Sequence, residues 1–152
     1  MSRILTFLLI IALGSTACKK EVDQAEVDRL KIEDYLAANN LTAQVDPSGL
    51  YYILEEPGTG AQPTVTDSVV VRYKGYLLDG TVFDQTTGTE TVVFNLNGLI
   101  PGWQIAIPLL KEGGNGIFIH PSVLAYGPFS PGGPIGPNEV LVFEIELVKV
   151  VN

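Results

Sequence analysis

Hydrophobic and polar residues alternate along residues 69–77, and this period of two predicts a β-strand with one face turned inward. Asp79 and Gly80 follow, and this pair favours a tight turn because both residue types tolerate a positive φ. The chain then returns through Phe83, an inward aromatic ring, with Asp84 directly after it. A carboxylate beside a buried ring needs either a partner or a function. The inward face of the first strand of this predicted hairpin carries Val69, Val71, Tyr73, Gly75 and Leu77.

Other apolar runs bounded by turn-forming residues predict the remaining strands. They cover residues 41–45, 50–54, 92–96, 117–119 and 140–151. After the N-terminal segment only residues 103–110 suit a helix, and Pro108 must lie near its end or distort it. Residues 121–138 are dense in Gly and Pro and predict a long loop. Four to six strands against one short helix indicate an α+β fold, in which an antiparallel sheet has a helix packed across one face.

A charged segment, residues 19–40, precedes the strands and predicts a further helix that stops at Asn39 and Asn40. The helix would either lie against the main domain or act as a spacer between that domain and a membrane. Its apolar stripe is thin, which favours a solvated helix with a weak contact. The stripe comprises Val22, Val27, Leu30, Tyr35 and Leu36.

The first seventeen residues have the pattern of an export signal. Arg3 is their only charge, residues 4–13 form an apolar run, and small residues follow. The apolar run is too short to span a bilayer. The sole cysteine, Cys18, falls where a bacterial lipoprotein is cleaved and lipidated, although Ser15 stands where such motifs usually carry Leu. The alternative is a plain secretory signal with an incidental thiol. We expect a lipid-anchored protein of the bacterial cell envelope, on the periplasmic or outer-surface side.

The chain therefore divides into a signal peptide (residues 1–17), a linker and helix (residues 18–46) and one domain (residues 47–152). A length of 152 residues suits a single domain with short extras. The excess of 17 acidic over 9 basic residues argues against nucleic acid or an anionic membrane surface as a partner.

The supply of reactive side chains is small. One cysteine and one histidine exclude an internal disulfide and a Cys/His metal cluster, and no nucleophile motif is present. His120, beside Pro121, is interpreted as a strand-end side chain rather than a base. We expect no metal, no cofactor and a monomeric protein.

The most distinctive feature of the composition is a set of aromatic residues that lie next to glycine and proline. Any one of them alone is best explained as part of a hydrophobic core. Their distribution over every element instead suggests an apolar cavity lined from several strands. The six are Tyr73, Phe83, Phe94, Trp103, Tyr126 and Phe143.

Four segments carry motifs that are modest singly and strong together: VRYKGYLLDGTVFD, LNGLIPGWQIAIPLLKEGG, the LAYG of residues 124–127, and EVLVFEIELVKV. In this order and spacing, over residues 50–150, they resemble the FKBP-type peptidyl-prolyl cis-trans isomerases. The N-terminal layout is similar to that of exported lipoprotein members. The resemblance implies an antiparallel sheet half-wrapped around one short helix, with an N-terminal helical extension and a cavity between sheet and helix.

The resemblance also implies the site residues. Trp103 would form the cavity floor, Asp84 and Tyr126 its polar rim, and the Ile100 backbone N–H would bind a substrate carbonyl. The implied catalytic residues are Asp84, Tyr126, Trp103, Phe83 and Tyr73. The implied substrate-binding residues are Phe94, Leu99, Ile100, Ile135 and Phe143.

Peptidyl-prolyl isomerisation of exported, proline-containing clients is thus the expected function, with an FKBP-directed macrolide as a possible inhibitor. One alternative is a chaperone or binding module that uses the same cavity with little turnover. A structural envelope lipoprotein without a peptide site is the other, and it predicts that Trp103 is fully inaccessible.

Overall fold

The structure is a computed structural model that describes residues 23–151. The predicted signal peptide, the proposed lipidation residue Cys18, and Val22 of the expected helical stripe lie outside these residues. Within residues 23–151, no helix has the length and hydropathy needed to cross a membrane.

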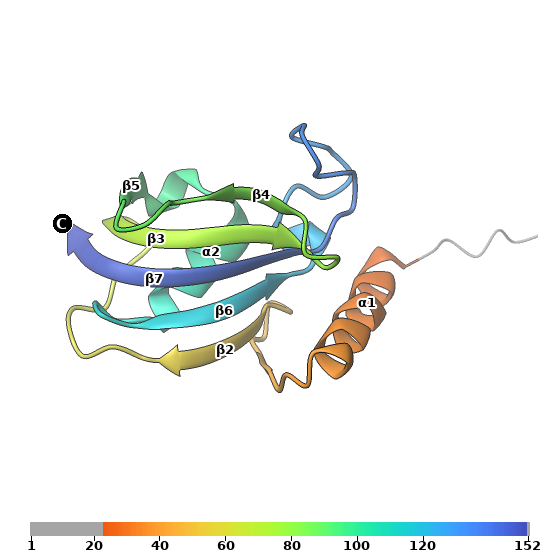
Figure 1. The fold of residues 1–152 in the computed structure, drawn as a ribbon, viewed down its shortest axis with the longest axis horizontal. Helices are drawn as coiled ribbons and strands as arrows, with labels where there is room; N and C mark the ends of the chain where they lie inside the picture. The colour runs from red at the N-terminus through yellow and green to blue at the C-terminus, as the bar shows by residue number, and fades with distance from the viewer. Residues whose placement is uncertain (1–22, 152) are drawn as a thin grey trace, which may run out of the picture.

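A seven-stranded antiparallel sheet forms the body of the domain (Figure 1). Its main path runs β1-β2-β6-β7-β3-β4, and β5 pairs with β3 beside β4. The α+β prediction is confirmed. The seven strands exceed the expected four to six, because every segment that the sequence predicted as a strand joins the sheet, including the two-residue β1. The strands are β1 (Gln44–Val45), β2 (Tyr51–Glu56), β3 (Ser68–Leu77), β4 (Val82–Gln85), β5 (Val92–Asn95), β6 (Asn115–His120) and β7 (Leu141–Val151).

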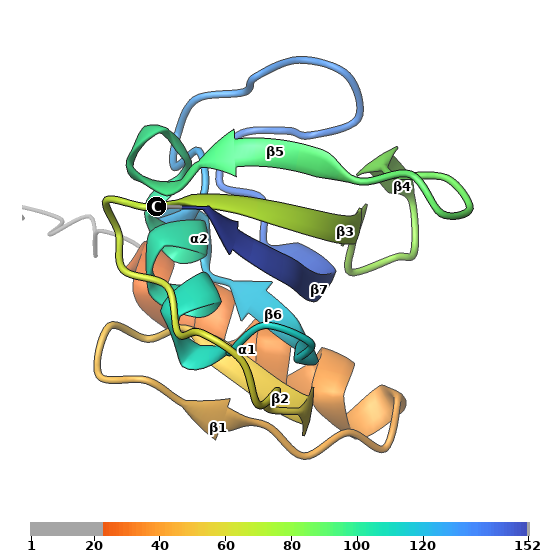
Figure 2. The same cartoon turned by 90° about the vertical axis from the view of Figure 1, so that its left-hand side faces the viewer.

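A short helix, α2 (Pro101–Ala106), packs across one face of the sheet (Figure 2). Pro101 opens it, where a missing N–H and a fixed φ suit the first turn. The helix tightens into a 3₁₀ turn, η2 (Ile107–Leu109), because Pro108 cannot donate the next helical hydrogen bond. Pro108 therefore lies just past the end of the α-helix, in the distorted turn that follows, in agreement with the expected end or distortion of the helix. The other 3₁₀ turns are η1 (Leu96–Gly98) and η3 (Ser122–Leu124).

The main hydrophobic core lies between α2 and the sheet. Its fully buried members come from both layers, since alternate residues of β3 and β7 face α2. Examples are Val71, Leu96, Ile107, Leu110 and Leu147.

The first helix, α1 (Gln24–Ala38), lies against the domain through two buried residues, Asp28 and Ile32. Ile32 is fully buried, whereas Leu30 of the expected stripe is 49% exposed. The helix lies against the main domain, one of the two arrangements that the sequence left open, and its buried side includes Asp28, a polar residue that a hydrophobic pattern assigns to solvent. Ile32 joins a second apolar cluster on the sheet face opposite α2, with Tyr76, Ile119, Val140 and Val142.

Candidate active site

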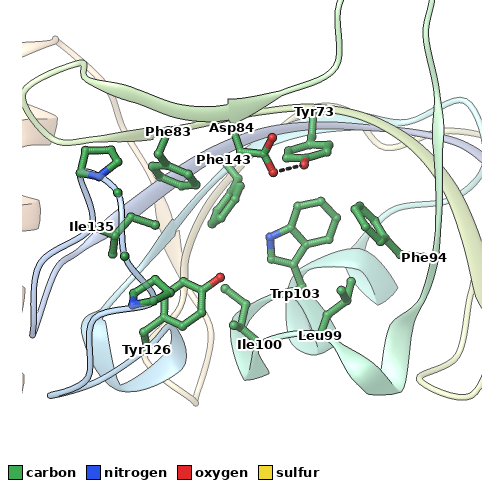
Figure 3. A pocket seen from close by; sticks show the side chains of 14 residues that line it. Tyr73, Phe83, Asp84, Phe94, Leu99, Ile100, Trp103, Tyr126, Ile135 and Phe143 are labelled. Carbon is green, nitrogen blue, oxygen red and sulfur yellow. Dashed lines mark hydrogen bonds between the residues drawn. The ribbon is translucent and has the colours of Figure 1, made fainter.

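A cavity of about 390 Å³ opens between the sheet, α2 and the loop that precedes β7 (Figure 3). Its lining is mostly aromatic and aliphatic, with a carboxylate and two phenol groups. All ten residues that the resemblance implied as site residues lie around this one cavity. The full lining comprises Tyr73, Phe83, Asp84, Phe94, Leu99, Ile100, Trp103, Tyr126, Pro131, Gly132, Gly133, Pro134, Ile135 and Phe143.

Trp103 is at the centre of an aromatic cluster. Its ring lies 5.3 Å from the ring centroids of Tyr73 and Phe143 and 5.7 Å from that of Phe94, each at an interplanar angle of 86°. Edge-to-face pairs of this geometry contribute about 0.5–1.5 kcal/mol each beyond burial. The indole is only 4% exposed, and it still borders the cavity. The rings on three sides therefore hold it as a rigid apolar surface.

Phe83 and Asp84 are consecutive residues that both line the cavity, which an ordinary strand does not allow. The register between β3 and β4 explains this. Asp84 pairs with Gly75 and Val82 pairs with Tyr76, so Phe83 is an extra residue in β4. Such a bulge redirects side chains locally. The sequence showed no signal for it.

Gly75 makes room for the redirected Phe83 ring. A Cβ at this position would lie 2.6 Å from Cε2 of Phe83 and 2.9 Å from Cε1 of Phe143, closer than real contacts allow. The absence of a side chain on β3 therefore lets Phe83 and Phe143 meet edge to face, with centroids 5.5 Å apart.

The polar side of the cavity is a paired phenol and carboxylate. The Tyr73 hydroxyl donates a hydrogen bond to Oδ2 of Asp84 (Figure 3). Burial raises the pKa of Tyr73 well above its ordinary value, and the hydrogen bond and charge of Asp84 raise it further. Tyr73 therefore keeps its proton at neutral pH and orients the carboxylate as a fixed acceptor at the cavity edge.

The turn before α2 borders the cavity through Leu99 and Ile100. Gln104 holds this turn, because its Nε2 donates to the carbonyl oxygens of Leu99 (2.8 Å) and Asn97 (3.3 Å). The Ile100 N–H makes no hydrogen bond with any residue from 23 to 151. A backbone donor beside an apolar cavity is suited to bind a carbonyl oxygen of a ligand. The sequence carried no signal for this role of Gln104.

The loop between β6 and β7 supplies the remaining wall. Tyr126 is 39% exposed, and Figure 3 shows it beside Ile135, across the cavity from Phe94. Ser130 closes the tip of the loop, since its Oγ donates to the Ile135 carbonyl at 2.5 Å and accepts from the Gly132 N–H. Residues 131–134 also line the cavity, and the glycine and proline content of this loop was the only hint of their position.

His120 lies behind the cavity and does not line it. The ring is fully buried against Phe143, with centroids 5.0 Å apart, and neither nitrogen has a hydrogen-bond partner among residues 23–151. Burial lowers its pKa to about 3. Gly102 is needed beside it, because a Cβ there would lie 2.7 Å from Cδ2 of His120.

A sheet wrapped over one short helix encloses an aromatic cavity that carries one carboxylate and two phenol groups, a lining suited to a small apolar group or peptide segment. The sequence family follows from a direct match: residues 60–148 fit the family model described as FKBP-type peptidyl-prolyl cis-trans isomerase. The chain belongs to this family.

Similarity to individual proteins supports the same family assignment. The chain is 44% identical over 130 residues to the outer membrane protein MIP of Legionella longbeachae, covering 84% of this chain and 56% of the relative. It is 39% identical over 140 residues to the isomerase FkpA of Escherichia coli, covering 90% of this chain and 51% of the relative. The chain thus spans about half the length of the curated relatives it matches.

Solved structures confirm the fold. A peptidyl-prolyl cis-trans isomerase from Pseudomonas syringae pv. tomato superposes with a TM-score of 0.74 at 33% identity, covering 85% of this chain and 94% of that one. The crystal structure of FkpA from Escherichia coli gives a TM-score of 0.72 at 38% identity, covering 84% of this chain and 61% of that one.

Proposed function

We propose that the protein accelerates the cis–trans isomerisation of X–Pro bonds in exported protein clients. The observation that carries this proposal is the convergence of Trp103, Tyr73, Asp84 and Tyr126 on one cavity, next to the free N–H of Ile100. Such a cavity can bind a pyrrolidine ring and a carbonyl together. Within the described part of the chain, its lining contains no Ser, Cys, Lys or His side chain, and the reaction needs no nucleophile.

The reaction is a rotation about one bond. Resonance in the planar peptide bond creates a barrier of about 18–20 kcal/mol, so an X–Pro bond isomerises in about 10–100 s without a catalyst. The twisted transition state loses this resonance, and its carbonyl carries less negative charge than the planar ground state. A dry aromatic cavity binds the less polar twisted form better than water does, which lowers the barrier.

Each group has a distinct part in this proposal. Trp103 is the apolar platform for the proline ring, and Phe83, Phe94, Leu99, Ile135 and Phe143 complete the walls. The Ile100 N–H binds a carbonyl beside the proline. Tyr73 orients Asp84, and Asp84 and Tyr126 hold the twisted amide without exchanging protons with it.

Replacing Asp84 with asparagine tests the polar part of the site. We expect kcat/KM for a proline peptide to fall roughly tenfold, because a hydrogen bond to a charged group contributes about 1.5–3 kcal/mol. The measurement is a protease-free isomerisation assay on the parent and the variant, with an FKBP-directed macrolide as a competitor.

Asp79→Asn is the matched control, since it removes the same charge from an exposed turn of the same hairpin and keeps an acceptor for the Thr81 N–H. We expect it to change kcat/KM by less than about twofold, within the range of ordinary surface substitutions. A parent protein without any acceleration would refute the enzyme proposal. If Trp103 fluorescence still responded to the peptide, the domain would be a binding module.

We propose further that the protein resides in the cell envelope, anchored by a lipid on Cys18. The support is the export-signal pattern of residues 1–17 and the similarity to a relative named as an outer membrane protein. Residues 18–46 would then link the anchor to the domain of residues 47–152, which we expect to be monomeric by light scattering.

The Cys18→Ser variant tests the anchor. We expect the parent to sediment with membranes and to incorporate labelled fatty acid, and the variant to lose both properties because no thiol remains for acylation. A parent recovered wholly in the soluble fraction would instead identify residues 1–17 as a plain secretory signal.

A further inference from the structure

Helix α1 carries a buried carboxylate that the apolar docking of the helix does not require. Asp28 is 1% exposed, and its Oδ2 accepts hydrogen bonds from the Ser122 N–H at 2.8 Å and the Ser122 hydroxyl at 2.6 Å. Its Oδ1 accepts a third from Gln24 at 2.7 Å. Burying a carboxylate costs free energy that only such donors offset. An apolar residue at this position would attach the helix without that desolvation cost. A directional contact to Ser122 is what the carboxylate adds.

Ser122 is also the anchor of the turn that carries Tyr126. Its carbonyl oxygen accepts hydrogen bonds from the N–H groups of Ala125 (3.0 Å) and Gly127 (2.8 Å), the two neighbours of Tyr126 in the chain. Gly127 has a φ of +58°, which its lack of a side chain permits. The base of the loop closes where the Asn138 N–H donates to the Gly127 carbonyl at 2.6 Å.

These contacts form one continuous path from the N-terminal helix to the cavity rim. Asp28 holds the N–H and hydroxyl of Ser122, the Ser122 carbonyl holds the backbone on both sides of Tyr126, and Tyr126 lines the cavity. Asp28 itself does not line the cavity.

We propose that α1 is a positioning element of the active site, in which Asp28 fixes the Tyr126 turn through Ser122. The proposal rests on the proposed isomerase function only where it concerns activity; its structural part concerns the order of the turn. Without Asp28, two donors of Ser122 lose their buried acceptor, and the turn samples positions in which Tyr126 leaves the rim. The apparent affinity for a peptide then falls by the fraction of molecules that retain the competent turn.

The Asp28→Ala variant of the full-length protein tests this with two measurements. Amide hydrogen exchange, followed by NMR, reports the order of the turn, and we expect exchange at Ala125 and Gly127 to accelerate at least roughly tenfold. Exchange at Asp67, whose N–H donates to the Thr64 carbonyl at the start of β3, at the end of the sheet away from α1 (Figure 1), should stay unchanged. In the isomerisation assay we expect KM to rise roughly three- to tenfold with little change in kcat.

Two further variants separate positioning from general stability. Ile32→Val removes a methylene from the apolar contact of the same helix, and it should lower the unfolding midpoint without changing exchange at Ala125 and Gly127 or KM. Asp28→Asn keeps one acceptor and similar volume, and it should restore part of both losses.

Unchanged exchange at Ala125 and Gly127 in a folded Asp28→Ala variant would overturn the proposal, as would an equal effect of Ile32→Val. If Asp28→Ala does not fold, Ser122→Ala removes only the hydroxyl donor, and it should shift exchange in the same direction by a smaller factor; no shift overturns the proposal. If the parent proves inactive as an isomerase, the proposed function fails, and the exchange measurements alone decide the inference about the turn.

Discussion

The Trp103→Ala variant is expected to lose measurable isomerase activity and about 3–5 kcal/mol of unfolding free energy, the usual cost of deleting a large buried aromatic side chain. The activity loss has a separate cause from the stability loss. Trp103 borders the cavity and supports Tyr73, Phe94 and Phe143 edge to face, so its removal takes away the platform for the proline ring and loosens three walls. Circular dichroism during urea unfolding and the isomerisation assay measure the two losses.

Leu110→Ala is the matched control for stability. Leu110 is fully buried in the same core but does not line the cavity. We expect it to cost about 2–5 kcal/mol of unfolding free energy and to leave kcat/KM within about twofold of the parent under conditions where it is folded. A loss of activity equal to that of Trp103→Ala would show that activity follows stability, and the platform role of the indole would be wrong.

The second large effect is a loss of stability in mild acid that depends on His120. Burial lowers the pKa of this group to about 3 in the folded protein, whereas an unfolded histidine titrates near ~6.5. As the pH falls below about 6.5, the unfolded chain gains a proton that the folded chain cannot accept, so the folded state loses about 1.4 kcal/mol per pH unit. Between pH 7 and pH 5 the free energy of unfolding should fall by about 2 kcal/mol.

His120→Leu should remove this dependence, because His120 is the only histidine of the chain and carboxylates, with pKa values near ~4, titrate mostly below pH 5. Urea unfolding at both pH values measures the difference for each protein. If the free energy of unfolding changed equally with pH in the parent and the variant, the buried ring would have to accept a proton in the folded state. That result would contradict the lack of hydrogen-bond partners for its nitrogens among residues 23–151.

The sequence predicted several elements around the cavity because local chemistry determines them. The Asp79-Gly80 turn, the alternation of β3 and the distortion at Pro108 all appear in the structure as expected. The resemblance to a known family then brought residues from distant segments together, and all ten surround one cavity. Their roles in the reaction stay predictions.

The features that the sequence did not reveal depend on contacts between distant segments. The bulge at Phe83 arises from pairing against Gly75, and no residue of β4 alone signals it. The buried side of α1 was misassigned because Asp28 meets Ser122, ninety-four positions later in the chain, and a hydrophobic pattern counts a carboxylate as solvent-exposed. The wall of residues 131–134 depends likewise on the way a long loop meets the cavity residues of distant segments.

The order of strands has a consequence for biosynthesis. β7, the last of the described strands in chain order, lies in the middle of the sheet between β6 and β3, where it pairs Ser68 with Val151. The sheet cannot close until residues 141–151 have been synthesised, and pairs this distant in the chain form slowly. During synthesis the two halves of the sheet, β1-β2-β6 and β3 with β4 and β5, therefore lack the strand that joins them.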